Sequence, residues 1–302
     1  MKKTTALRNL IAAKQILVKP GAYDALSAKL LEKAGFSIVG LSGYCLSVTK
    51  LGLPDLSFIN LTDVCEAAEN INRAIGIPLI VDIDTGFGNA LNVMYTTEKV
   101  IQTGAAAFHI EDQLFPKRCG FVKGKAVISA DEMVGKIKAA KHIRDELDKD
   151  FVIIARSDVK GTPGGTIEAL IDRCKRYIDA GADMIYPEAL KTPEEVERVA
   201  TELQFPIHLN RSTAVNAPVL TLEQLQKLGI TICSEPGGAM RVAAAAIERY
   251  ANGFYEEDIS FALEEEKKLK STVAANLHDL SGMNEWLALG KQFDEDANRK
   301  EE

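Results

Sequence analysis

The sequence lacks long apolar runs, paired cysteines and an excess of positive charge, which are the features that indicate a membrane protein, a zinc site or a nucleic-acid-binding protein. No apolar run approaches the roughly 20 residues that cross a bilayer, and residues 1–20 lack the long apolar segment of a signal peptide. Five cysteines are scattered without a CxxC pair, which argues against a disulfide framework and a zinc site. The net charge of −7 argues against nucleic acid. We therefore expect a cytoplasmic chain without membrane or nucleic-acid partners.

Short apolar runs alternate with longer amphipathic segments along most of the 302 residues. Glycine follows several of these segments, in the phrases EKAGF, QTGAA, DAGAD and KLGIT, as it does at the carboxyl end of a helix. Repeated strand and helix units predict an α/β fold, a (β/α)8 TIM-type barrel. A doubly wound open sheet is the alternative, but no GxGxxG motif follows the first strand. The eight predicted strands are 16–19, 37–41, 78–82, 105–110, 151–155, 184–186, 206–209 and 231–233.

The last part of the chain lies outside these eight units. We divide the sequence into a catalytic barrel, residues 1–257, and a charged helical extension, residues 258–302. Apolar residues of the extension, such as Trp286 and Leu287, need a partner surface, which is either a neighbouring subunit or the chain's own barrel. We expect an oligomer, and we expect the tail 294–302 to be disordered.

Polar residues follow the predicted strands where a barrel of this kind carries its chemistry, at the carboxyl ends. Several carboxylates crowded together raise each other's pKa unless a cation intervenes. Oxygen ligands favour Mg²⁺ or Mn²⁺, with one aspartate bound directly and the other acids holding its waters. Ser42, the Gly43 backbone N–H and Arg156 could then hold a substrate carboxylate. The residues at this rim are Ser42, Asp82, Asp84, Glu111, Arg156, Glu188 and Asn210.

The segment IEDQLFPKRCGFVKGK, residues 110–125, places a thiol in a polar loop. Lys117 and Arg118 precede Cys119, and neighbouring cations lower the pKa of a thiol. Gly120 and Gly124 suit a loop that closes over a substrate. A free cysteine is most often a small buried hydrophobe, but the polar surroundings here favour a catalytic thiol.

Taken in order, the motifs resemble the isocitrate lyase/phosphoenolpyruvate mutase superfamily over nearly the whole chain. They are PGAYDALSAKLLEKAGF, SGY…GLPDLSF, VDIDTGFGN, HIEDQ…PKRCG, ARSD and PEAL. The resemblance implies a barrel whose eighth helix swaps onto a neighbour in a dimer of dimers, a homotetramer. It also implies Mg²⁺ at Asp82, with Asp55, Asp84 and Glu111 acting through water. Glu188 and Asn210 would line the pocket of a pyruvate-like carboxylate.

The KRCG motif resembles the lyase branch of this superfamily. This resemblance implies that a 2-hydroxy acid, the small-molecule partner, is cleaved between C2 and C3, and that Cys119 protonates the carboxylate enolate that leaves. Lys117 and Arg118 would stabilise the thiolate and the developing charge. Tyr44 either faces the pocket or packs beneath it.

Three positions depart from the methylisocitrate lyase pattern. Phe121 replaces a histidine, Gly40 replaces a tyrosine, and the seventh-strand loop reads NRSTAVNAP, with Arg211 and Ser212 after the asparagine. These changes affect the distal half of the substrate, so we expect a 2-alkylmalate or a methylisocitrate-type acid, and Arg211 would suit an additional carboxylate.

A Mg²⁺-dependent carbon–carbon lyase is the function that the sequence favours. The alternatives are oxaloacetate hydrolysis to oxalate and acetate, phosphorus–carbon chemistry as in the mutases, and a non-catalytic barrel that binds a metal or an oxo acid.

Overall fold

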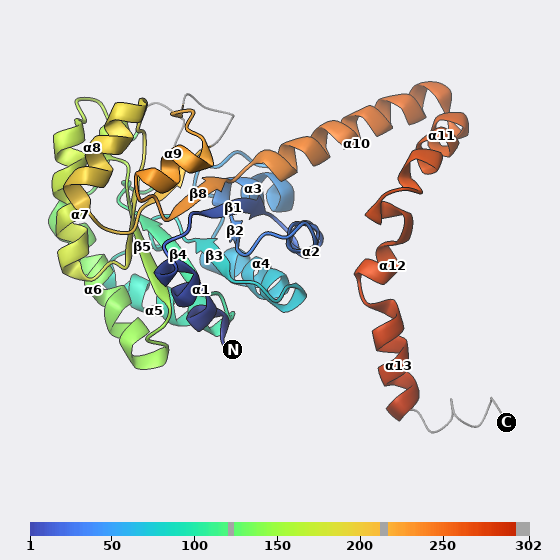
Figure 1. Cartoon of the computed structure of the whole chain (residues 1–302), viewed down its shortest axis with the longest axis horizontal. Helices are drawn as coiled ribbons and strands as arrows, with labels where there is room; N and C mark the ends of the chain where they lie inside the picture. Colours follow the sequence, from blue (N-terminus) through green and yellow to red (C-terminus); the bar gives the residue numbers. More distant parts are fainter. Residues whose placement is uncertain (120–123, 212–216, 294–302) are drawn as a thin grey trace. The chain divides into compact units, whose positions relative to one another are not determined.

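The computed structural model describes residues 1–119, 124–211 and 217–293. Eight parallel strands form one sheet in the order β6-β5-β4-β3-β2-β1-β8-β7. A parallel bridge between Ile185 and Ile207 joins its two edges, so the sheet is a nearly closed barrel (Figure 1). The strands are β1 Leu17–Ala22, β2 Val39–Leu41, β3 Leu79–Asp82, β4 Ala107–Glu111, β5 Val152–Ser157, β6 Met184–Pro187, β7 His208–Asn210 and β8 Ile232–Glu235.

Helices separate consecutive strands, as the alternating pattern predicted. Figure 1 shows them on the outside of the sheet. Gly35, Gly104, Gly181 and Gly229 have φ between +75° and +107° near helix ends, where glycine adopts the left-handed conformation without a steric penalty. The helices between strands are α2 Ala25–Lys33, α3 Gly43–Leu46, α4 Leu61–Ala74, α5 Ala90–Gln102, α6 Ala130–Leu147, α7 Ile167–Ala180, α8 Pro193–Leu203 and α9 Leu222–Lys227.

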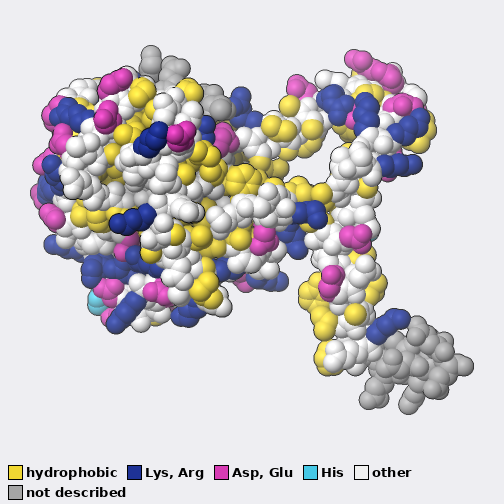
Figure 2. All heavy atoms as spheres, in the orientation of Figure 1, with side chains coloured by type: hydrophobic (Ala, Val, Ile, Leu, Met, Phe, Trp, Pro, Cys, Tyr) yellow, Lys and Arg dark blue, Asp and Glu magenta, His cyan; other side chains and the backbone are white. Residues whose placement is uncertain are grey.

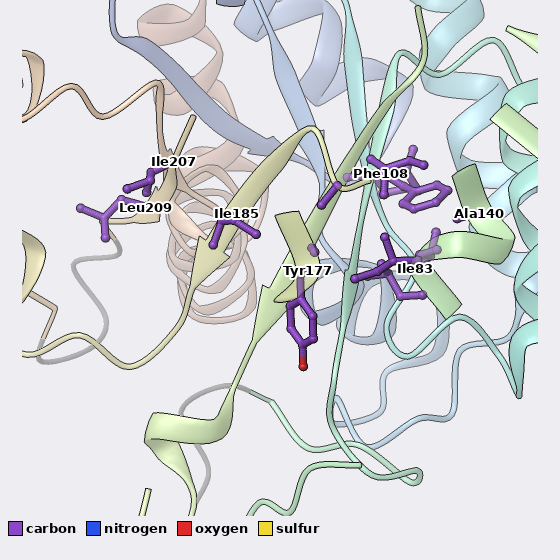
Figure 3. Packing of buried hydrophobic residues seen from close by; sticks show 14 of the residues in the cluster. Ile83, Phe108, Ala140, Tyr177, Ile185, Ile207 and Leu209 are labelled. Atoms are coloured by element: carbon purple, nitrogen blue, oxygen red, sulfur yellow. The ribbon is translucent and has the colours of Figure 1, made fainter. Parts of the chain in front are cut away.

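Side chains alternate between the two faces of each strand and build two apolar clusters. In β3, Leu79 and Val81 belong to the larger cluster, between strands and helices, whereas Ile80 belongs to a smaller one. Figure 3 shows Phe108 of β4 beside Ala140 of α6 in the larger cluster. The smaller cluster includes Leu7 of α1, Lys3–Ala12, and fills the amino-terminal end of the barrel.

The chain forms two compact units, residues 1–241 and residues 242–302. Helix α10, Gly238–Glu257, crosses this division, and the sequence-based division after residue 257 falls at its end. The second unit continues with α11 Ile259–Leu269, α12 Leu277–Leu280 and α13 Met283–Phe293, which agrees with the helical pattern of the sequence. The tail 294–302 lies outside the described residues. None of the described helices has the length and apolar character needed to cross a membrane.

Candidate active site

A polar layer follows the inner apolar cluster toward the carboxyl ends of the strands. The strand period of two places Asp82 on the same face as Ile80, and Arg156 on the same face as Ile154. A cavity of about 60 Å³ lies in this layer. The predicted residues that line it are Ser42, Tyr44, Asp55, Asp82, Glu111, Lys117, Cys119, Arg156, Glu188 and Asn210.

Asp82 is held by backbone N–H groups from two sides. Gly43 donates to its Oδ2 at 3.1 Å, and Asp84 donates to its Oδ1 at 3.1 Å. Burial raises the pKa of Asp82, but His109, Lys117 and Arg156 outweigh burial, so the pKa is lowered. Asp82 is therefore an ionised carboxylate whose orientation is fixed. The sequence analysis assigned the Gly43 N–H to the substrate carboxylate. In the structure, this N–H donates to Asp82 instead.

Lys117 is buried between two other acids. Its Nζ lies 2.6 Å from Asp55 Oδ1 and 2.8 Å from Asp84 Oδ1. Burial raises the pKa of Asp84 to about 7 despite this lysine, because Asp82 and Asp55 add like charge nearby. Asp84 also has φ +48°, a left-handed conformation that aspartate tolerates better than most residues. Lys117 therefore forms ion pairs with two carboxylates, and it also lines the cavity together with Cys119.

Arg156 joins the acids of neighbouring strands. Its Nε and Nη2 donate to Asp158 at 2.8 and 3.1 Å. The same guanidinium lies 3.3 Å from Glu111 Oε2 and 3.5 Å from Glu188 Oε2. Burial raises the pKa of Glu111 well above its usual range in spite of Arg156. Asp158, which the sequence reasoning did not select, therefore orients the arginine that was assigned to the substrate.

The carboxylates in this layer fit a hard divalent cation. Asp55, Asp82, Asp84 and Glu111 outnumber the two cations that contact them, Lys117 and Arg156, and Glu111 Oε1 is buried without a hydrogen-bond partner in the described part of the chain. In that same part, no three His, Cys, Asp or Glu side chains are grouped so as to hold a metal alone. Mg²⁺ keeps several waters and needs only one or two protein carboxylates, so Asp82 as the direct ligand agrees with this arrangement.

Cys119 is half-buried and lines the same cavity. Its N–H donates to Asp55 O at 3.2 Å. Gln113 fixes the preceding residue, accepting from the Arg118 N–H at 3.0 Å and donating to the Arg118 carbonyl at 2.9 Å. The backbone that carries the thiol is thus held beside Asp55 at the edge of the cavity.

Ser42 caps the short helix α3 and lines the cavity. The Ser42 Oγ accepts from the Cys45 N–H at 3.5 Å, and Tyr44 faces the cavity rather than packing beneath it. Arg211 is half-buried, and its N–H donates to Ser234 O at 2.8 Å. Neither Arg118 nor Arg211 belongs to the described lining of the cavity. Gly120, Phe121 and Ser212 lie outside the described residues.

Sequence reasoning missed several polar residues deeper in the layer. Lys19, Tyr186 and Ser234 line the cavity, and His208 lies beside Tyr186 with ring centroids 4.2 Å apart. Lys19 was placed at the end of a predicted strand, whereas β1 continues to Ala22. The available signal was a lysine inside an otherwise apolar run, because a charged residue within a buried strand needs a reason.

Comparisons with known proteins identify relatives of this chain. The family model described as phosphoenolpyruvate phosphomutase matches residues 7–255. The chain is 41% identical over 242 residues to a 2-methylisocitrate lyase of Halalkalibacterium halodurans, covering 80% of this chain and 78% of that one. It is 38% identical over 247 residues to the 2,3-dimethylmalate lyase of Eubacterium barkeri, covering 82% and 84%.

Solved structures give the same result. Oxaloacetate acetylhydrolase, bound to the inhibitor 3,3-difluorooxalacetate, superposes with a TM-score of 0.87 at 30% identity, over 96% of this chain and 97% of that one. Phosphonopyruvate hydrolase in complex with oxalate and Mg²⁺ superposes with a TM-score of 0.82 at 29% identity, over 97% and 99%. The chain therefore belongs to the phosphoenolpyruvate mutase/isocitrate lyase superfamily, as its motifs predicted, and it is an enzyme of the lyase class.

Proposed function

We propose that this enzyme is a Mg²⁺-dependent lyase that cleaves a 2-hydroxy di- or tricarboxylate between C2 and C3. The products are pyruvate or a related 2-oxo acid and a second carboxylate. The 2-methylisocitrate and 2,3-dimethylmalate lyases among its relatives support this substrate class. The observation that carries the proposal is a single cavity lined by the oriented Asp82, the thiol of Cys119 and Ser42.

Acids at the carboxyl ends of β3 and β4, together with Asp55, would hold Mg²⁺, with Asp82 as the direct ligand and Asp55, Asp84 and Glu111 around its waters. Mn²⁺ would suit the same oxygen ligands. When bound, the ion would supply Lewis-acid polarisation of the substrate oxygens. The ammonium of Lys117 lies between Asp55 and Asp84, so it would either move away when the ion binds or share these two carboxylates with the ion.

The chain's own residues would orient the substrate and handle its protons. Ser42 and Arg156 would hold the carboxylate next to the reacting carbon, with Arg156 itself fixed by Asp158. Tyr44, Glu188 and Asn210 would line the rest of the pocket, and Arg211, Ser212 and Gly120 would belong to the loops around the distal half.

In the proposed cleavage, a base of the site accepts the proton of the C2 hydroxyl, the oxygen electrons form the carbonyl at C2, and the C2–C3 electron pair moves to C3. Cys119 then delivers the thiol proton to C3, since a carboxylate enolate is strongly basic and must be quenched within the site. Arg118 and Lys117 would stabilise the thiolate that remains.

Oxaloacetate hydrolysis is the second candidate, because an oxaloacetate acetylhydrolase is among the most similar solved structures. One assay separates the two functions. The protein is incubated with Mg²⁺ and a panel of 2-methylisocitrate, 2,3-dimethylmalate, other 2-alkylmalates and oxaloacetate, and products are identified by chromatography.

Release of a 2-oxo acid from any hydroxy acid of the panel would support the lyase. Oxalate and acetate from oxaloacetate, with no cleavage of the hydroxy acids, would assign the hydrolase instead. A panel without turnover in the presence of Mg²⁺ would contradict both.

We also propose that the enzyme is a homotetramer in which helices of the second unit pack on a neighbouring subunit. Trp286, Leu287 and Phe293 of α13 are 72%, 57% and 77% exposed, and Figure 2 shows apolar side chains along this helix. Burying such a surface is favourable. Light scattering after size exclusion should give four chains for the native protein and fewer for Trp286→Ser with Leu287→Ser. A native monomer at micromolar concentration would contradict the proposal.

A further inference from the structure

Lys19 lies inside the barrel, on the inner face of β1. The strand period of two places it on the same face as Leu17, which belongs to the inner apolar cluster, and its register partner on β8 is Ser234. The residue is only 5% exposed, yet it lines the cavity that contains Asp82 and Cys119. A lysine with this placement is directed at whatever occupies the cavity.

Gly40 on β2 provides the space for this side chain. A Cβ added at Gly40 would lie 3.0 Å from both Cδ and Nζ of Lys19 and 3.1 Å from its Cε. The end of Lys19 therefore occupies the position that a side chain at residue 40 would fill. This position is two residues before Ser42, which caps helix α3 and is proposed to hold the substrate carboxylate.

Lys19 differs from the other cations of the cavity in its partners. Lys117 lies against Asp55, and Arg156 lies against Asp158. None of the ion pairs or hydrogen bonds found among the described residues involves the Lys19 ammonium, so no carboxylate oxygen there lies within 4.0 Å of it. Since an unpaired buried ammonium is unfavourable, an oxygen of the bound substrate is the partner that the cavity can supply.

The surroundings of Lys19 favour an amine that can lose its proton. Burial lowers the pKa of Lys19 to about 8, with Asp82 of β3 raising it and Arg156 of β5 lowering it. His109 of β4 and His208 of β7 also face it, and burial keeps both neutral by lowering their pKa values. A base whose pKa is close to the working pH is the effective kind in general acid–base catalysis.

We propose that Lys19 is a further catalytic residue, the base that accepts the proton of the substrate hydroxyl at C2. This inference rests on the lyase function proposed above. The neutral Nζ takes the hydroxyl proton and becomes an ammonium, while the oxygen electrons form the C2 carbonyl and the C2–C3 pair passes to C3. Cys119 protonates C3, and proton transfer from the ammonium back to the thiolate, directly or through water, restores both groups.

The test begins with Lys19→Met, which keeps the length of the side chain and removes the amine. Turnover of the hydroxy acid that the native enzyme cleaves should fall roughly a hundredfold or more, the range for a positioned base. The limb of the pH profile of kcat near pH 8 should disappear as well. Lys136→Met is the matched control, because Lys136 is a buried lysine that donates to Thr85 O at 3.0 Å and does not line this cavity.

Two further measurements distinguish a base from a packing residue. Methylamine should restore part of the activity of Lys19→Ala and none to Cys119→Ser, because only the former lacks an amine. In the native protein without substrate, reductive methylation with ¹³C and an NMR titration should show one lysine with a pKa near 8. This resonance should be absent from Lys19→Met.

The outcomes separate the two proposals. A native enzyme that cleaves a hydroxy acid, together with a Lys19→Met variant of undiminished turnover and unchanged pH profile, would overturn the role of Lys19 and leave the lyase intact. Failure of methylamine to rescue a folded Lys19→Ala would also count against the base. A native enzyme that cleaves no hydroxy acid would overturn the lyase, and the base with it.

Discussion

The barrel interior has an acidic half, strands β3–β6, and a lysine half, strands β7, β8, β1 and β2. In the acidic half, Asp82, Glu111 and Glu188 are linked through Arg156, Lys117 and backbone N–H groups, although Glu111 Oε1 and Glu188 Oε2 also lack hydrogen-bond partners among the described residues. In the lysine half, Lys19 has no ion pair, and both ring nitrogens of His208 and the Ser234 Oγ lack hydrogen-bond partners among the described residues.

The difference indicates a division of tasks within one cavity. Paired groups with fixed positions bind ions and carboxylates without reorganising, which is the basis of electrostatic preorganisation. Buried groups without partners have shifted pKa values and can exchange protons with a ligand. In the proposed mechanism, the acids of the acidic half would hold the cation, Arg156 and Ser42 would hold the carboxylate from the two halves, and Lys19 of the lysine half would accept the proton.

The largest effect should come from the acidic half. Asp82→Ala removes the oriented carboxylate that accepts from Gly43 and Asp84, so Mg²⁺-dependent turnover should be abolished. Calorimetry with Mg²⁺ and oxalate should show lost or greatly weakened binding. Asp145→Ala, at a half-exposed surface pair with Lys141, is the control and should bind both normally. If Asp82→Ala bound Mg²⁺ as tightly as the native protein, Asp82 would not be the direct ligand.

Cys119→Ser should come next. Replacing the thiol by a much weaker acid should lower turnover by roughly a hundredfold or more, the range for a positioned acid, and should leave the melting temperature nearly unchanged. Cys65→Ser is the matched control, since Cys65 is also half-buried but does not line the cavity. A fully active Cys119→Ser enzyme would place the proton donor elsewhere.

Gly40→Ala tests the lysine half, because the added methyl group would displace the amine of Lys19. The new Cβ would meet the flexible end of Lys19 at 3.0 Å, so the amine must shift while the backbone stays in place. We expect a loss of about tenfold in kcat, smaller than for Lys19→Met, because the amine must move by only a few tenths of an ångström, whereas a misplacement of about 1 Å costs roughly a hundredfold. Binding of oxalate and Mg²⁺ should persist, and parallel loss of both would show a general collapse of the site instead.

The smallest effect concerns stability. Burial raises the pKa of Asp84 to about 7, whereas an unfolded aspartate has a pKa near 3.8. Between these values the folded chain keeps a proton that the unfolded chain has lost, so the free energy of unfolding falls as the pH rises from about 4 to about 7. Asp84→Asn should remove this contribution of at most a few kcal/mol. Urea unfolding with a chelator at several pH values measures the slope, and an identical slope in both proteins would contradict the assignment.

Much of the fold follows from local patterns in the sequence. All eight predicted strands are present, because β-branched apolar runs and the glycines that end helices act within a few residues. The rim residues converge because parallel strands carry their carboxyl ends to one side of a barrel. The end of β1 was predicted wrongly at Lys19, because the Pro20 and Gly21 that follow are residues that usually end a strand, whereas β1 continues to Ala22.

By itself, the sequence determined the barrel fold, the polar residues that follow each strand and the membership of the superfamily. Each of these depends on residue types at fixed spacing along the chain. Only the tertiary structure decided which charges meet. Lys117 pairs with Asp55, 62 residues away, and Lys19 fills the space left by Gly40 on the next strand. Ionisation and reactivity depend on burial and on distances of a few ångströms across the barrel, and these exist only after the strands have closed around one another.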